Sequence, residues 1–375
     1  MKRKILIVTQ PEITSRVGGA ITMFCFLANH FQSKGYDVQG VCNSGISGRP
    51  EQLLPEIPLH NLYEQDGSAG NFGPKIKILI RGIQPDCIIF FFHYLYIDAG
   101  LGHEFDNIPK IITFHSRPDF YFAIHPWAKR KMRPLYRNTT AQILFDSFRD
   151  LLPRFIRKGR VVTIPNPVQG PDVTRDFDKC TRRIIFLSRI DRMKGVDIMI
   201  KAFGEVYRSH PDWSLDIWGE FESEQLHCEY VSLAGKCGVS DGINFRGVTK
   251  TPVKTLCDYD FCIFPSLFEG FGIGLAESLK AGLPCIGLKK CSGVNEIIED
   301  GVNGFLCDET PEDMARKINL LIENPSLLKR MSEEALRVRE RFDENHIKWL
   351  WDNLVEDCIN HKNRPELFPV KKLLQ

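Results

Sequence analysis

The chain has 375 residues, of which 43% are hydrophobic and 26% are charged. This length exceeds the roughly 250 to 300 residues at which one core stops growing, so we expect two domains, and the globular composition excludes a disordered or repetitive chain. The total of 49 Lys or Arg against 47 Asp or Glu conceals a basic first half, because residues 1–165 hold 21 basic and 13 acidic side chains.

Compartment signals come from the N-terminus, the apolar stretches and the cysteines. The apolar run after Met-Lys-Arg-Lys ends at Thr9, which is not typical of a secretory signal. The longest apolar stretch, Cys87 to Ile97, is interrupted by His93 and falls short of the roughly 20 residues of a spanning helix. The twelve cysteines are scattered without a Cys-x-x-Cys pair, which favours reduced thiols. We therefore expect a cytoplasmic protein.

The first half alternates predicted strands with helical or loop segments. A β-branched apolar run at residues 4–9 predicts a strand, and residues 20–34 carry apolar side chains at helical spacing before Gly35. Further strands are predicted at 38–42, 87–92, 111–115, 142–146 and 161–164. Such alternation predicts a parallel sheet covered by helices.

A second series of the same kind follows a break in periodicity. Pro165-Asn-Pro and the polar stretch through Lys179 read as a linker. Strands are then predicted at 183–188, 214–218, 243–246, 261–265 and 284–288, with helices at 196–210, 274–281 and 344–358. The fold class is therefore α/β, with two tandem Rossmann-like doubly wound domains at residues 1–168 and 169–345. The sequence leaves open where the C-terminal helix and tail, 346–375, pack, a return to the N-terminal domain included.

The segment from Glu269 to Glu277 carries the most chemistry. A buried strand, a loop with glycines and a helix beginning near Ile273 place free amides and the positive end of a helix dipole at a strand end, which suits a phosphate. Glu277, one turn into the helix, is placed to accept hydrogen bonds from vicinal hydroxyls. The alternative is structural: Glu277 neutralises the helix start and the glycines only make a tight turn. The spacing departs from the Gly-x-Gly-x-x-Gly of dinucleotide sites.

Arg189 and Lys194 lie in the turn after the first strand of the second series. An unpaired cation pair at that strand end suits a diphosphate, since each charged hydrogen bond contributes about 1.5 to 3 kcal/mol. The alternative is a surface salt-bridge pair, because Asp191 and Asp197 are close in sequence.

In the first domain, Gly18 and Gly19 occupy the corresponding turn, where they allow backbone amides to approach phosphate or sugar. His115 ends a predicted strand and points to the edge at which open α/β sheets bind ligands. Taken alone, the glycine pair is a weak motif, and a lone histidine is more often structural.

A basic and aromatic stretch runs from His125 to Arg137. Its Lys129, Arg130, Lys131 and Arg133 alternate with Trp127 and other apolar residues. A solvated helix face is the simpler interpretation. The other is docking onto an anionic membrane surface or an anionic acceptor, for which basic residues beside interfacial aromatics are suited.

Together these features resemble the retaining GT-B glycosyltransferases, specifically glycosyltransferase family four, over about residues 3–345. The resemblance rests on Glu269 and Glu277 as a Glu-x7-Glu signature, on Arg189 with Lys194, on the Gly-Gly loop and on His115. Pro165-Asn-Pro-Val168 resembles the family's linker, and Asn244-Phe-Arg-Gly-Val248 its base-binding turn. The two domains are then expected to face each other across a cleft.

The resemblance also implies roles for the site residues. Glu269 and His115 contact the donor sugar, Arg189 and Lys194 the diphosphate, and Glu277 the ribose. Donor contacts are further implied, mostly through the backbone, for Gly18, Gly19, Gly219, Val248, Phe271, Gly272 and Ile273. The leaving diphosphate assists the incoming hydroxyl, so no enzymic nucleophile is expected.

Asp258-Tyr-Asp260 resembles the metal-binding Asp-x-Asp of the other major glycosyltransferase fold, but it lies at a helix-to-strand junction without a further carboxylate cluster. We therefore expect no metal and no cofactor beyond a nucleotide-sugar cosubstrate, a UDP-sugar by resemblance. The expected reaction transfers a hexose or N-acetylhexosamine to a glycan or glycolipid such as lipopolysaccharide. A UDP-sugar epimerase of the same fold and a catalytically silent binding subunit are the alternatives.

Overall fold

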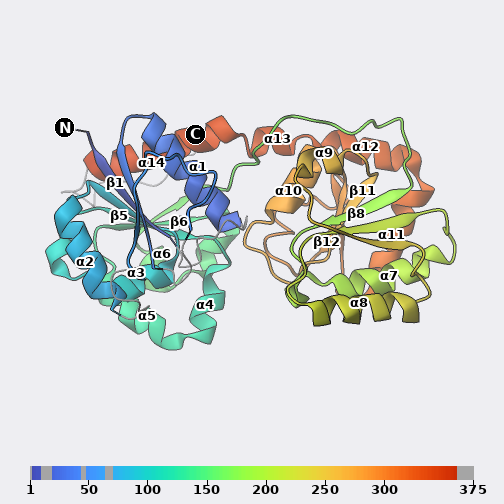
Figure 1. Ribbon diagram of the computed structural model, residues 1–375, viewed down its shortest axis with the longest axis horizontal. Coiled ribbons are helices and arrows are strands. Elements are labelled where there is room, and N and C mark those ends of the chain that lie inside the picture. The colour runs from blue at the N-terminus through green and yellow to red at the C-terminus, as the bar shows by residue number, and fades with distance from the viewer. Residues whose placement is uncertain (1, 10–18, 44–47, 64–70, 361–375) are drawn as a thin grey trace. The chain divides into compact units, whose positions relative to one another are not determined.

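The computed structural model describes residues 2–9, 19–43, 48–63 and 71–360. The chain divides into two compact units, Met1–Asn166 with Asn345–Gln375, and Pro167–Glu344 (Figure 1). Sequence reasoning places the division two residues later, and the C-terminal helix belongs to the first unit. Each unit is described by itself below.

Unit 1 is built on a seven-stranded sheet in the order β3-β2-β1-β4-β5-β6-β7, in which neighbouring strands are parallel. The strands are β1 (Lys4–Val8), β2 (Asp37–Cys42), β3 (Leu59–Asn61), β4 (Cys87–Phe90), β5 (Lys110–Phe114), β6 (Thr139–Ile143) and β7 (Arg160–Thr163). All four residues of β4 and all five of β5 are buried, as expected for strands covered on both faces.

Helices cover both faces of this sheet (Figure 1). They are α1 (Gly19–Ser33), α2 (Phe72–Ile83), α3 (His93–Ala99), α4 (Pro118–Ile124), α5 (Pro126–Met132), α6 (Arg154–Arg157) and α14 (Glu344–Asn360), with short 3-10 turns η2 (His103–Phe105), η3 (Arg133–Leu135) and η4 (Asp146–Leu151). One core joins α1 and α14 to the sheet: Phe24 and Phe31 of α1 and Trp351 of α14 lie in the same buried cluster as Ile5 and Ile7 of β1.

Unit 2 is built on a six-stranded parallel sheet in the order β10-β9-β8-β11-β12-β13. Its strands are β8 (Arg183–Leu187), β9 (Ser214–Trp218), β10 (Ile243–Gly247), β11 (Phe261–Phe264), β12 (Cys285–Leu288) and β13 (Gly304–Cys307). Its helices are α7 (Val196–Tyr207), α8 (Glu224–Lys236), α9 (Pro252–Leu256), α10 (Ile273–Lys280), α11 (Pro311–Glu323), α12 (Pro325–Ala335) and α13 (Val338–Arg341), with the 3-10 turn η5 (Arg192–Lys194). In Figure 1, α7, α8 and α11 lie on one side of this sheet and α9, α10 and α12 on the other.

The predicted α/β class with two Rossmann-like domains is confirmed by these sheets. One strand prediction was displaced: residues 142–146 were expected, whereas β6 spans Thr139–Ile143. Its Thr140 and Gln142 are polar but buried, and the Gln142 side chain donates to two backbone carbonyls, so polarity concealed a core strand. The short strands β3 and β13 were not predicted. All twelve cysteines are free, and within the described residues no helix is long and apolar enough to cross a membrane.

Candidate donor site and basic pocket

The sheet order of unit 2 reverses at β8. From β8 the chain moves outward to β9 and β10, and it then returns to β11 on the other side of β8. In open parallel sheets, ligands bind outside the carboxyl ends of the strands at such a reversal. The segments after β8 and β11 both begin there, and these are the two segments that sequence analysis singled out.

Lys194 and Glu269 meet at this reversal. The ammonium of Lys194, from η5 after β8, forms an ion pair with a carboxylate oxygen of Glu269 from the loop after β11. The Ser266 hydroxyl donates to the same carboxylate oxygen at 2.9 Å. The two charged side chains are only 12% and 13% exposed, so the pair is largely shielded from water. Lys194 is therefore paired, and its partner is neither of the aspartates that the sequence offered.

Two glycines allow the segments to approach so closely. Gly195 has φ of +63°, and a Cβ there would lie 2.1 Å from the backbone oxygen of Pro265. Gly219, which follows β9, has φ of +148°, and a Cβ there would lie 1.8 Å from the backbone oxygen of Ser188. Any larger residue would push the strand-end loops apart. Gly219, a predicted donor contact, thus has a definite structural requirement.

The start of α10 presents backbone rather than side chains. Gly272 adopts φ of +82° directly before the helix, whose first turn contains no acidic residue. The Phe271 ring is buried edge-on against Phe342, with ring centroids 5.0 Å apart, so its side chain is part of the core. The amide role expected for Phe271, Gly272 and Ile273 stays a prediction. Such a helix start suits an anion.

Glu277 lies within α10, and the burial of its carboxyl group raises its pKa to about 7, opposed by the charge of Lys280. Within the described part of the chain its carboxyl group makes no hydrogen bond. The alternative in which Glu277 caps its helix is not what the geometry shows, because the N-cap position is Gly272 and no side chain caps that end.

Arg189 and Val248 lie at the same edge but are more open. Arg189 is 75% exposed and its closest carboxylate, Asp191, is 3.7 Å away. The two cations therefore differ: Arg189 is exposed and lies near Asp191 at the surface, whereas Lys194 is shielded and paired with Glu269. Val248 follows β10 after Gly247, whose φ is +72°, and is itself 69% exposed.

The Asp-x-Asp alternative is occupied by structural contacts. Asp260 is fully buried and accepts hydrogen bonds from Arg175, Thr181 and the backbone N–H of Arg183. These donors use the carboxylate that a metal would need. Within the described ranges, no three His, Cys, Asp or Glu side chains gather in a geometry for a metal ion.

In unit 1, His115 directly follows β5 and its ring stacks on Phe91 with centroids 4.7 Å apart. Burial lowers its pKa to about 3, and its Nε2 atom is buried without a hydrogen-bond partner among the described residues. His93, which sequence reasoning did not select, follows β4. Both of its ring nitrogens are also buried without a hydrogen-bond partner among the described residues. Gly19 begins α1, and Gly18 lies outside the described residues.

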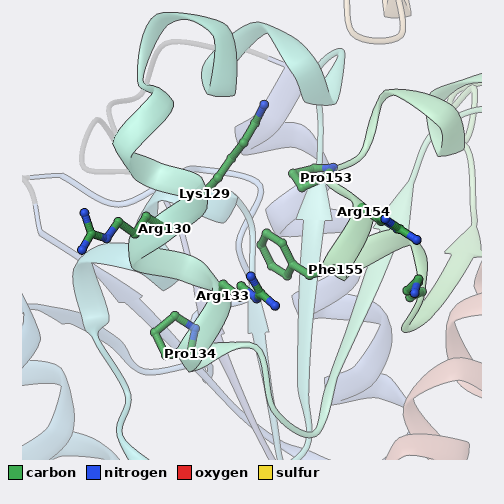
Figure 2. Close-up of a pocket in the computed structure, with 8 residues that line it drawn as sticks. Lys129, Arg130, Arg133, Pro134, Pro153, Arg154 and Phe155 are labelled. Atoms are coloured by element: carbon green, nitrogen blue, oxygen red, sulfur yellow. The ribbon is translucent and has the colours of Figure 1, made fainter.

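The predicted basic segment divides into two groups. Lys129, Arg130 and Arg133 line a cavity of about 750 Å³ (Figure 2). Lys131 does not line it, and lies 3.9 Å from the Asp98 carboxylate and over the Trp127 ring. The rest of the cavity wall comes from a later segment that sequence reasoning missed: Pro153, Arg154, Phe155 and Lys158, with Pro134 from the first segment.

Comparison with known proteins agrees with this architecture. Residues 17–169 match the family model Glycosyltransferase Family 4, and residues 175–338 match Glycosyl transferases group 1. An uncharacterized glycosyltransferase of Haemophilus influenzae is 23% identical over 344 residues, which is 90% of this chain and 96% of that protein. The GtfA subunit of a UDP-N-acetylglucosamine–peptide N-acetylglucosaminyltransferase from Streptococcus pneumoniae is 28% identical over 54% of this chain and 41% of its own length.

Among solved structures, the Anabaena HepE protein in complex with UDP and glucose superposes with a TM-score of 0.74 at 18% identity, covering 95% of this chain and all of that one. The two parallel-sheet units therefore have the GT-B fold, which together with the matched regions defines a glycosyltransferase. The chain belongs to the group 1 glycosyltransferases. The family and fold expected from the sequence are confirmed.

Proposed function

We propose that the protein transfers a hexose or N-acetylhexosamine from a UDP-sugar to a glycan or glycolipid acceptor, with retention of the anomeric configuration. The observation that carries the proposal is the shielded Lys194–Glu269 pair at the sheet reversal of unit 2, together with the start of α10, which no side chain caps. Two of the similar proteins support the donor: one is named for UDP-N-acetylglucosamine, and the other was solved with UDP and glucose.

The chemistry of these residues fits a departing diphosphate. Lys194 and the α10 amides supply fixed positive charge where negative charge grows on the leaving UDP, and such preorganised groups need no rearrangement during the reaction. Arg189 adds a further positive charge from the surface. In this proposal they do so without a metal or another cofactor. Glu269 accepts from sugar hydroxyls while its charge is held by Lys194. Assay in the presence of a chelator tests the metal independence, and a rate that falls would contradict it.

The remaining roles come from the family resemblance. Glu277 accepts from the ribose hydroxyls, the backbone at Val248 contacts the base, and His115 contacts the donor sugar. The neutral state of His115, whose pKa is lowered to about 3, suits an uncharged hydrogen-bonding role rather than that of a general base at neutral pH.

For the acceptor, we propose a cell-surface glycan or glycolipid such as lipopolysaccharide, reached at the cytoplasmic face of a membrane. Peripheral contact with an anionic membrane surface would involve the basic segment 125–137 of unit 1. Its exposed Trp127 beside unpaired basic side chains supports this.

The decisive experiment is a panel of labelled nucleotide sugars incubated with the purified protein, first without acceptor. Slow release of free nucleotide diphosphate from one donor is expected, because the donor site alone permits hydrolysis. An epimerised donor would show the epimerase alternative, and an unchanged donor with intact binding would show a silent subunit. Once an acceptor is known, the anomeric proton coupling in the product measures retention.

A further inference from the structure

The cavity described above is strongly basic and comes from two chain segments that sequence reasoning did not connect. Lys129 and Arg130 lie on α5, Arg133 begins η3, Arg154 begins α6 and Lys158 follows it. Figure 2 shows α5 on one side and the later segment on the other, with Arg133 and Phe155 between them. Pro134 and Pro153 complete the wall. The charged helix face expected from the sequence is therefore one side of a hollow.

The five basic residues that line the cavity have no carboxylate partner within the described residues. Two basic residues nearby that do not line it are paired: Lys131 lies beside Asp98, and Arg157, between Arg154 and Lys158, pairs with Asp150 at 3.2 Å. Arg137, also outside the cavity, donates to the Pro134 carbonyl. Asp98 and Asp150 thus neutralise Lys131 and Arg157, and not the residues that line the cavity. What remains around the cavity is uncompensated positive charge. In Figure 2 the Arg133 guanidinium lies at the cavity beside Phe155, whereas Arg130 and Arg154 border it with their charged ends directed to opposite sides. Guanidinium groups match the oxygens of a phosphate.

Exposed apolar side chains lie on the chain segment that leads into the cavity wall. Phe120, Ile124 and Trp127, on α4 and the first turn of α5, are 46%, 57% and 52% exposed. On α5, Ala128 and Met132 are buried and Lys129 and Arg130 line the cavity, as does Arg133 at the start of η3. Trp127 is exposed, and the Lys131 ammonium lies over its ring. Apolar side chains that can enter a lipid interface, beside a hollow of free cations, favour a lipid headgroup over a soluble anion.

We propose that Lys129, Arg130, Arg133, Arg154 and Lys158 form a site for the phosphate group of an anionic lipid headgroup. The proposal rests on the membrane contact suggested above and sharpens it, because it replaces a diffuse basic face by a pocket of defined residues. A diffuse face would use every basic residue on it, each contributing about fivefold to membrane affinity. A pocket uses only the residues that line it.

Two double variants of equal charge separate these cases. Arg133→Gln with Arg154→Gln removes one cavity residue from each segment, and Lys131→Gln with Arg157→Gln removes two basic residues beside them. Cosedimentation is measured with vesicles of phosphatidylcholine and phosphatidylglycerol. The cavity double variant should lose at least about tenfold in affinity, whereas the control double variant should bind like the unchanged protein. Circular dichroism confirms that all four exposed positions tolerate the changes.

Two further arms test the ligand chemistry. Vesicles in which oleate supplies the same surface charge in place of phosphatidylglycerol should bind more weakly, since a planar carboxylate lacks the tetrahedral arrangement of oxygens around phosphorus. Equal losses in the two double variants, or equal binding to oleate vesicles, would overturn the pocket. Binding to a soluble glycerol-phosphate polymer, with no binding to vesicles, would overturn the lipid assignment.

These measurements need no nucleotide sugar. A protein that binds vesicles through this cavity but uses no donor would contradict the proposed reaction and leave the pocket standing. A protein that transfers sugar, but whose vesicle binding does not depend on the cavity residues, would contradict the pocket and leave the proposed reaction standing.

Discussion

The ion pair of Lys194 and Glu269 keeps two charged side chains in place where strands β8 and β11 end. A carboxylate that binds sugar hydroxyls must stay ionised in a site with little water, and a cation that binds diphosphate must not fold onto the protein surface. Each of the two side chains satisfies the other, and Ser266 adds a hydrogen bond to the carboxylate. When a diphosphate arrives, Lys194 has a second anion within reach and does not need to be reoriented.

Replacing Lys194 by alanine removes both functions. We expect donor affinity to fall by roughly thirtyfold, on the order of 2 kcal/mol, because a charged hydrogen bond to the diphosphate is lost and Glu269 keeps an uncompensated charge. Calorimetric titration with UDP-glucose measures this. The control is Arg192→Ala two residues away, since Arg192 is exposed and pairs with Glu229. Equal affinities in the two variants would remove Lys194 from the donor site.

The raised pKa of Glu277 predicts that donor binding depends on pH. Its pKa is raised to about 7 because burial disfavours the charged carboxylate. Ribose hydroxyls that donate to the carboxylate favour the charged form, so the pKa falls in the complex. Affinity is then full above pH 7 and declines by up to about tenfold per unit as the pH falls below 7.

The measurement is titration with UDP-glucose across this range in buffers of different ionisation enthalpy, which also detects proton release on binding. Glu277→Gln should weaken binding and flatten the profile. A steep profile that persists in this variant would assign the titration to another group.

At the scale of elements, the site depends on how closely the loops after β8 and β11 pack. Gly195→Ala is expected to destabilise the protein by about 2 to 4 kcal/mol, because a Cβ would lie 2.1 Å from the Pro265 oxygen in addition to the strain of a positive φ. Gly238→Ala is the matched control: its φ is +72°, but a Cβ there meets nothing within 4 Å, so only about 1 kcal/mol is expected. Urea denaturation compares the two. Similar losses would mean that φ alone matters.

Element prediction succeeded where hydrophobic pattern and burial coincide. Both ends of β9, Ser214–Trp218, were predicted correctly. The start of α10 at Ile273 was also predicted, because Gly272 adopts a positive φ directly before the helix. Prediction failed for β6, whose Thr140 and Gln142 are polar although the fold buries them, and for the three residues of β3, which carry too little pattern.

For the site, sequence reasoning found the strand-end residues but not their contacts. Lys194 and Glu269 were assigned to different parts of a ligand, and 75 residues separate them, so no local pattern reveals that they pair. Arg154 and Lys158 were missed for the same reason. They join Lys129 and Arg133 across a cavity only after β6 and β7 are placed side by side in the sheet.

At the scale of the whole molecule, unit 1 closes its core with the two ends of the described chain. Ile347, Trp351 and Leu354 of α14 lie in the same buried cluster as Phe24 and Phe31 of α1. His30 of α1 also lies 2.7 Å from the carboxylate of Asp352. Unit 2, residues 167–344, is continuous in sequence and lies between the two parts of unit 1. During synthesis, the core of unit 1 therefore cannot be completed until all of unit 2 has been made.

Trp351→Ala tests this dependence. The side chain is buried, so its removal leaves a cavity and is expected to cost about 3 to 5 kcal/mol. Trp349→Ala, two residues earlier on an exposed position of the same helix, should change stability by no more than about 0.5 kcal/mol. Hydrogen exchange followed by mass spectrometry locates the effect: exchange should accelerate in α1, β1 and β4 and stay unchanged in β8, β9 and β11. Acceleration that spreads equally through unit 2 would show that the two units unfold as one cooperative body, and the C-terminal helix would then stabilise the whole chain rather than unit 1 alone.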